Sequence, residues 1–181
     1  MPAVSLWSRE DGVLGAVAPL GLAAAAGTAL VVDLDQHGPR YPGRTTLASL
    51  VSEGPTRRHL SPERRGVAVL GNGGIATADA EEVVRALVEG WPNVVLRLAS
   101  SIDPPLRALK VMPLVPGGLF DEPRGPVVYQ ASSWRVQPPQ RSIVLPRPAR
   151  RTVGALLAGQ TPLPRDRWVR AWRTVWNQPW T

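Results

Sequence analysis

The chain has 181 residues, 44% of them hydrophobic, which is enough to bury one sizeable core, so a single domain is expected. It contains no cysteine, which excludes disulfides and thiolate metal sites, and its two histidines, His37 and His59, cannot by themselves build a metal cluster. Neither a metal nor another cofactor is expected. No apolar run is long enough to span a bilayer, and the N-terminus lacks the basic segment of a secretory signal. A cytoplasmic protein is therefore expected.

The net charge of +7 is unevenly distributed. Residues 1–90 hold eight arginines against ten acidic residues, whereas residues 91–181 hold twelve arginines and the single lysine, Lys110, against four acidic residues. A basic C-terminal half indicates an acidic protein partner, an anionic membrane surface or nucleic acid. The alternative is a solvated surface with no binding role.

The N-terminal elements follow the order strand, loop, helix. Val4–Ser8 predicts a short strand, Arg9–Gly15 a polar loop and Ala16–Ala26 an Ala-rich helix. This is the layout of a P-loop, in which glycines let backbone N–H groups wrap phosphates, a lysine neutralises charge and a Ser/Thr hydroxyl holds Mg²⁺.

The chemistry that such a loop needs is missing. With Gly15 aligned to the glycine before the lysine, Ala16 and Val17 occupy the Lys and Ser/Thr positions. Gly12 is retained, but Glu10 and Asp11 place negative charge beside it, and Lys110 is distant in the sequence. A loop of this composition is expected to repel a triphosphate.

The later segments alternate between strand and helix, which predicts an α/β fold, a three-layer domain with a mainly parallel central sheet. The expected strands are residues 28–34, 66–70, 93–99, 111–115, 126–129 and 142–145, and the expected helices are residues 45–52, 77–90, 150–158 and 164–177. Asp103 before two prolines predicts one further helix start. Gly71–Gly74 is expected to form a tight turn, with an anion-binding nest as the alternative.

In serial order these segments resemble the MinD/ParA family of P-loop ATPases, and most closely its CpaE/TadZ-like branch, which is associated with pilus and secretion machines. The resemblance rests on four stretches in the places of the deviant Walker A loop, the second strand, the Walker B strand and the closing tail. They are Trp7–Gly15, Thr28–Gly38 (TALVVDLDQHG), Pro92–Pro105 (PNVVLRLASSIDPP) and Ser142–Pro164. Gly66–Gly74 stands where the family has its third strand.

The departures from that family predict a degenerate P-loop NTPase-like fold. Glu10 and Ala16 stand at the two lysine positions, and Arg97 stands at the Walker B aspartate, where a cation cannot ligate Mg²⁺. Asp33 and Asp35 remain on the second strand and are expected to act in capping and turn formation. The enzyme alternative keeps nucleotide hydrolysis with unusual ligands, such as an arginine like Arg9 in place of the lysine.

Four tryptophans recur every fourth residue at the C-terminus, with arginines largely on other faces of the helix. The tryptophans are Trp168, Trp172, Trp176 and Trp180, and the arginines include Arg167, Arg170 and Arg173. Three placements are open: the helix covers its own sheet, docks into a partner's groove, or lies on an anionic membrane as the basic C-terminal helix of MinD-like proteins does. These residues are treated as candidate partner contacts.

The resulting division is residues 1–163 as the degenerate α/β domain and residues 164–181 as a C-terminal helix that is part of that domain or a docking tail. Arg147, Arg150 and Arg151 are candidate phosphate contacts for a nucleic-acid-binding alternative.

The expected function is that of a non-catalytic scaffold or adaptor, a pseudo-ATPase that binds an acidic protein or a pilus or secretion component. Homodimerisation and contact with the inner membrane surface are further alternatives.

Overall fold

A sheet of seven parallel strands forms the centre of the protein, in the order β3-β2-β4-β1-β5-β6-β7. The computed structural model describes residues 3–62, 65–100, 108–117, 119–121, 123–160 and 165–178. The strands are β1 (Ala3–Trp7), β2 (Thr28–Asp33), β3 (Gly66–Leu70), β4 (Val94–Arg97), β5 (Leu109–Pro113), β6 (Val127–Gln130) and β7 (Ile143–Leu145). The predicted α/β fold with a parallel sheet is confirmed.

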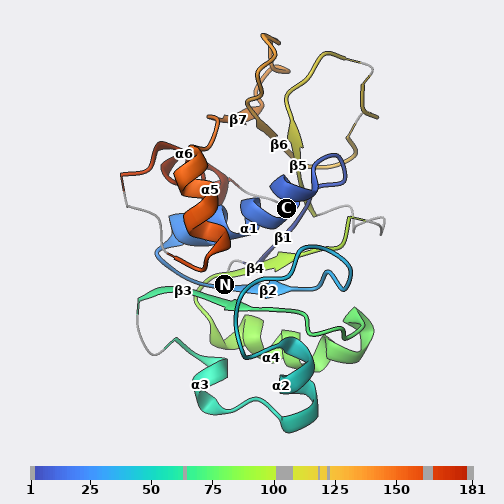
Figure 1. The fold of residues 1–181 in the computed structure, drawn as a ribbon, viewed down its shortest axis with the longest axis vertical. Coiled ribbons are helices and arrows are strands. Elements are labelled where there is room, and N and C mark those ends of the chain that lie inside the picture. The colour runs from blue at the N-terminus through green and yellow to red at the C-terminus, as the bar shows by residue number, and fades with distance from the viewer. Residues whose placement is uncertain are drawn as a thin grey trace.

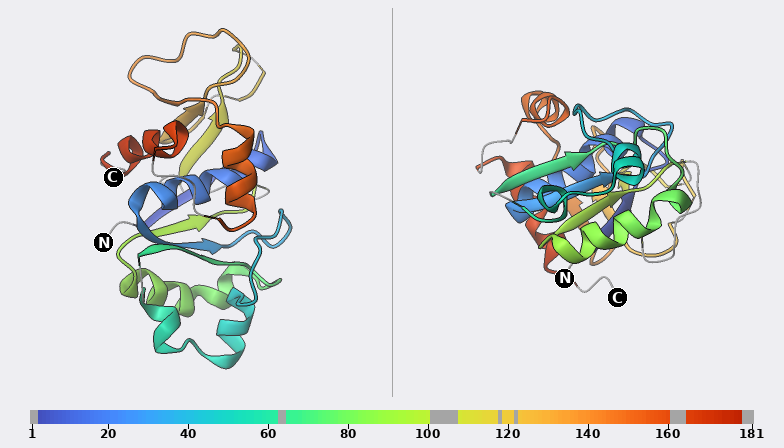
Figure 2. Two further views of the ribbon diagram at one scale, coloured as in Figure 1. Left: turned by 60° about the vertical axis from the view of Figure 1, so that its left-hand side comes forward. Right: turned by 90° about the horizontal axis from the view of Figure 1, so that it is seen from below.

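Helices lie on both faces of this sheet, as a parallel sheet requires (Figure 1). One face is covered by α1 (Gly12–Ala26), α5 (Arg150–Leu157), α6 (Arg167–Ala171) and α7 (Arg173–Trp176), and the helices α5 to α7 all contact α1. The other face carries α2 (Leu47–Glu53), α3 (Arg57–Leu60), the 3-10 turn η1 (Thr77–Ala80) and α4 (Glu81–Gly90). Figure 2 shows the same layers from two further sides.

Each face of the sheet has its own hydrophobic core. On the α1 face, Leu6, Val31, Val95 and Val111 pack against buried residues of α1. On the α4 face, residues of β2 and β4 pack against α2 and α4. The alternation along β2 and β4 follows from the two-residue period of a strand, which sends neighbouring side chains to opposite faces.

Most predicted elements lie within a few residues of their expected positions. The short helix α3 was not predicted, and the expected helix start at Asp103 lies outside the described residues. The expected turn after β3 is present, with a positive φ of 78° at Gly73 and the Asn72 side chain accepting from the backbone N–H of Gly74.

The largest difference concerns the first loop. It was predicted to span Arg9–Gly15, but α1 begins at Gly12, so only Ser8 to Asp11 separate β1 from α1.

Candidate functional site

The loop between β1 and α1 is closed by its own helix cap. The Asp11 side chain accepts a hydrogen bond from the backbone N–H of Leu14 at 2.9 Å, and the Asp11 carbonyl accepts from Gly15 at 2.8 Å. Gly12 and Gly15 are therefore helical residues, and Ala16 and Val17 are buried in the core. The prediction that these residues form a degenerate phosphate-type loop is wrong in its geometry, because Asp11 supplies a strong N-cap and starts the helix early.

The single lysine lies at this loop, contrary to what its distance in the sequence suggested. Lys110 is on β5, opposite Trp7 of β1, and its Nζ lies 2.5 Å from Oε1 of Glu10 and 5.0 Å from the centroid of the Trp7 ring. Both charged side chains are more than nine-tenths buried. The positive charge beside the loop is thus neutralised inside the protein, in an ion pair and a cation–π contact.

A second buried ion cluster lies at the carboxyl ends of β2 and β4. Arg97 donates to Asp33 Oδ2 at 3.2 Å, to Asp35 Oδ2 at 3.0 Å and to the Pro39 carbonyl at 2.7 Å. Its guanidinium lies 5.1 Å from the centroid of the Tyr41 ring. All three charged residues are at least nine-tenths buried. One cation is therefore shared between two carboxylates.

Burial of the cluster shifts the pKa values of two of its groups. Burial raises the pKa of Asp33 to about 6, although the Arg97 charge and hydrogen bonds to its carboxylate act in the opposite direction. Burial also raises the pKa of Tyr41 well above its usual value, again against the effect of Arg97. Asp33 therefore keeps its proton to a higher pH than an exposed aspartate does.

The oxygens of Asp35 are used in the same local structure. Asp35 Oδ1 accepts from the backbone N–H groups of His37 and Gly38, which confirms the predicted turn-forming role. A side chain at Gly38 would collide with both the Asp35 carboxylate and the Arg97 guanidinium, so glycine is required for this close approach. Within the described residues, no group of three or more His, Cys, Asp and Glu side chains is placed to hold a metal ion.

We call the four C-terminal tryptophans Trp168, Trp172, Trp176 and Trp180 the tryptophan ridge, and the first two of them are part of the core. Trp168 and Trp172 are 1% and 0% exposed, their rings meet edge to face at 5.5 Å, and they pack on α1 where Gly21 leaves room for them. Trp168 Nε1 donates to Gln130 Oε1 at 2.7 Å. The prediction that these two residues contact a partner is wrong, because they close the hydrophobic core of their own domain; the alternative of a helix that covers its own sheet is the one observed.

The other members of the ridge differ. Trp176 is half-buried and donates from Nε1 to the Leu22 carbonyl at 2.8 Å, so it also fastens the C-terminal segment to α1. Trp180 lies outside the described residues. Arg167, Arg170 and Arg173 are exposed, as an amphipathic segment predicts. Residues 165–178 consequently belong to the α/β domain.

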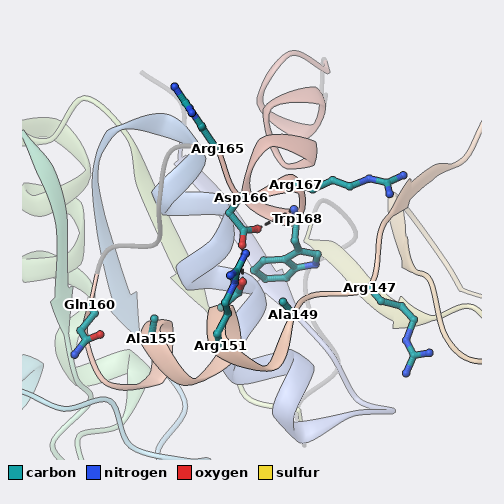
Figure 3. A pocket seen from close by; sticks show the side chains of 10 residues that line it. Arg147, Ala149, Arg151, Ala155, Gln160, Arg165, Asp166, Arg167 and Trp168 are labelled. Atoms are coloured by element: carbon teal, nitrogen blue, oxygen red, sulfur yellow. Dashed lines mark hydrogen bonds between the residues drawn. The ribbon is translucent and has the colours of Figure 1, made fainter.

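Next to the buried Trp168, exposed arginines surround a groove of about 540 Å³. Its charged lining residues come from the starts of α5 and α6: Arg147, Arg151, Arg165, Arg167 and Asp166. In the view of Figure 3, Arg147 and Arg165 lie at opposite ends, with Arg151 and Asp166 between them. The sequence singled out Arg147 and Arg151 and missed Arg165; Arg150 is exposed at the start of α5 but does not line the groove.

Asp166, the one acid among the described residues that line this groove, is engaged in local structure. The Asp166 carboxylate accepts from the Thr152 hydroxyl and from the backbone N–H groups of Trp168 and Val169, at the start of α6. Burial would raise the pKa of Asp166, but these hydrogen bonds and the Arg151 charge outweigh it and lower the pKa below its usual value. Asp166 is thus a fixed negative charge that offsets only part of the arginine charge.

A second cavity of about 320 Å³ adjoins the first at the carboxyl end of the sheet and shares Arg147 and Trp168 with it. Its wall is mostly apolar or uncharged polar, and includes Val13, Leu14, Pro113 and Val153. Val13 is 60% exposed although it is a large hydrophobic residue. The carboxyl ends of parallel strands are the usual place for ligand binding in open α/β sheets.

No protein-family model matches the sequence, and no curated protein is significantly similar to it. Among the helices that the structure describes, none combines the length and the apolar character needed to cross a membrane.

Proposed function

We propose that this protein is a nucleotide-independent scaffold or adaptor, a non-catalytic relative of the MinD/ParA ATPases. The observation that carries the proposal is Arg97, buried between Asp33 and Asp35 at the carboxyl edge of the sheet. In a phosphoryl-transfer enzyme, carboxylates at this edge hold Mg²⁺ or orient water. Here the same oxygens bind a fixed cation of the protein.

The first loop supports the same proposal independently. Phosphate binding by a P-loop needs free backbone N–H groups and an unpaired lysine. Asp11 occupies the cap position of α1, and Lys110 is paired with the buried Glu10. To bind a triphosphate, Lys110 would have to leave Glu10, and breaking this ion pair is costly because it leaves a buried charge without a partner.

The partner surface in this proposal is the basic C-terminal half, where an acidic protein would bind. The arginine-lined groove replaces the tryptophan ridge as the contact region, because Trp168 and Trp172 are inaccessible. The assignment to a pilus, secretion or other envelope-associated machine, and with it a cytoplasmic location beside the inner membrane, rests on the resemblance in segment order alone.

Isothermal titration of the purified protein with Mg-ATP and with Mg-ADP, paired with thermal-shift measurements, tests nucleotide independence. We expect neither heat of binding nor a shift in melting temperature at millimolar nucleotide. Saturable, Mg²⁺-dependent binding at micromolar nucleotide that disappears in Arg9→Ala would contradict the proposal and favour an ATPase with an unusual cationic ligand. Arg9 is an exposed residue of the loop, so this variant leaves the core intact.

A further inference from the structure

Two neighbouring cavities differ in the chemistry of their linings. They share Arg147 and Trp168, and we call their union the joint groove. The α5–α6 half is lined by Arg147, Arg151, Arg165 and Arg167. Among the described residues that line the other half, the charged ones are Arg147 and Asp11, whose carboxylate caps α1, and the exposed Val13 lies at the start of α1.

We infer that the joint groove binds a short acidic peptide segment with one apolar side chain. Its carboxylates would contact the arginines at the starts of α5 and α6, and its apolar side chain would lie beside Val13. This inference rests on the proposed function, since it names the chemistry of the partner that a scaffold of this kind would hold.

Charge complementarity identifies the acidic part of the ligand. Four exposed arginines surround the α5–α6 half, and its single acid, Asp166, already accepts three hydrogen bonds within the protein. Arg147, Arg165 and Arg167 form no ion pair with a carboxylate among the described residues. Guanidinium groups bind carboxylates in paired hydrogen bonds, so a run of acidic side chains matches this surface.

The apolar half favours a peptide over a nucleic acid. Single-stranded nucleic acids are held by a cationic path combined with aromatic rings on which bases stack. Among the described residues, the only aromatic ring that lines either cavity belongs to Trp168, which is 1% exposed and already packed against Trp172. In the half beside Val13 the described lining carries one cation, Arg147, and one carboxylate, Asp11, and is otherwise uncharged, with apolar surface that suits an aliphatic side chain.

Fluorescence anisotropy with three labelled probes tests the inference. The first probe is a short peptide of glutamates and aspartates around one leucine, the second has serine in place of that leucine, and the third is an oligothymidylate of equal charge. Each is titrated with the wild-type protein and with variants of exposed residues, after circular dichroism has verified the fold of each variant.

We expect the leucine peptide to bind most tightly and its affinity to fall with added salt. The double variant Arg147→Glu/Arg167→Glu should weaken that binding about tenfold or more, since it reverses two charges in the groove. Arg170→Glu/Arg173→Glu changes the net charge equally, outside both cavities, and should have a much smaller effect. Val13→Ser should weaken the leucine peptide about threefold and leave the serine peptide unchanged.

Three results would overturn the inference. Equal losses in the two double variants would show attraction by net charge alone, and equal affinity for the two peptides in every variant would exclude the apolar half. Tighter binding of the oligothymidylate, lost in Arg147→Glu/Arg167→Glu, would make the groove a nucleic-acid site. Each of these leaves nucleotide independence standing, whereas Mg-ATP binding that is lost in Arg9→Ala and kept in Arg147→Glu/Arg167→Glu would refute the proposed function whatever the peptide result.

Discussion

Arginine has opposite roles in two regions of this protein. Arg97 is 2% exposed, and its donors are taken up by Asp33, Asp35 and the Pro39 carbonyl. Arg147 and Arg167 are exposed beside a groove and form no ion pair with a described carboxylate. The difference shows that charge at the carboxyl ends of β2 and β4 serves the fold, while the charge available to a ligand lies around the starts of α5 and α6.

The strongest way to test this contrast is to remove the buried cation. Arg97→Met leaves Asp33 and Asp35 buried without a counter-charge and should lower the free energy of unfolding by about 3–5 kcal/mol. Urea denaturation measures this loss. The matched control is the triple variant with Asp33→Asn and Asp35→Asn, whose amide oxygens can still accept the backbone hydrogen bonds of the turn; it should recover much of the stability. A loss below about 1 kcal/mol in Arg97→Met would show that the cluster is not structural.

The proton balance of the same cluster predicts an unusual pH dependence. The folded pKa of Asp33, about 6, lies above the ordinary value of 3.8, so the folded state binds the proton more tightly than the unfolded state does. The stabilisation from this group is fully present below about pH 4 and is lost as the pH rises through about 6. It amounts to about 3 kcal/mol, because each pKa unit corresponds to about 1.4 kcal/mol.

Urea unfolding at pH 4.5 and at pH 7 tests this dependence in the wild type and in Asp33→Asn. The variant should lack the fall in stability between the two pH values that Asp33 causes. The lowered pKa of Asp166 acts in the opposite direction, but its effect lies below pH 4 and is common to both proteins. An identical pH dependence in the two proteins would contradict the assignment of the proton to Asp33.

A smaller effect is expected where α1 supports the wall of the groove. A methyl group at Gly21 would collide with the rings of Trp168 and Trp172. Gly21→Ala should therefore cost about 1–3 kcal/mol through overpacking, although alanine is the better helix former. Thermal and urea unfolding measure it, with Gly154→Ala as the control, since a side chain at that helical glycine meets no atom. Equal stability of Gly21→Ala and the wild type would indicate that the tryptophans do not pack on α1 as described.

The smallest effect is predicted for the exposed arginines. Arg147→Ala and Arg167→Ala should change the free energy of unfolding by no more than about 0.5 kcal/mol, because these side chains are exposed. Urea denaturation of these two variants and of Arg97→Met measures their losses of unfolding free energy, so that exposed and buried arginines can be compared directly. A loss of about 2 kcal/mol in either variant would mean that the groove arginines also hold the fold together, and the contrast with Arg97 would fail.

The sequence predicted the fold better than the site. Strands such as residues 28–34 and 66–70 were recognisable because buried parallel strands are apolar runs between turn residues. The start of α1 was misplaced, because the glycines predict a loop that extends to Gly15, whereas the Asp11 side chain caps a helix that begins at Gly12. A signal was available there, since an acidic residue followed by an apolar run is typical of a helix start.

The two ion clusters depend on strand pairing that local patterns do not encode. Lys110 meets Glu10 because β5 pairs with β1 in a register that sets Lys110 opposite Trp7. The sequence shows Arg97 at the position of the Walker B aspartate and Asp33 at the end of a strand. Their contact follows only from the pairing of β2 with β4. If β2 and β4 are taken as neighbouring parallel strands, Asp33 and Arg97 are expected at the same edge of the sheet.

The tryptophan ridge shows a different limit. The four-residue spacing correctly marked one apolar face, but the same pattern fits a helix that packs on its own domain and one that docks on a partner. Gly21 on α1, more than 140 residues earlier, provides the space that decides between them. The segment also divides at Trp172 into α6 and α7, which the periodicity did not indicate.

One experiment tests most directly whether the carboxyl ends of β1 and β2 are closed to nucleotide while the arginine groove is open to a peptide. In ¹H–¹⁵N NMR spectra of the labelled protein, Mg-ATP is added first and the leucine-containing acidic peptide second. We predict that Mg-ATP leaves the amide signals of Trp7–Glu10 and Asp33–Gly38 unmoved, and that the peptide shifts those of Arg147–Thr152 and Arg165–Trp168. Saturable shifts of Trp7–Glu10 with Mg-ATP, with none in the groove on adding the peptide, would contradict the account.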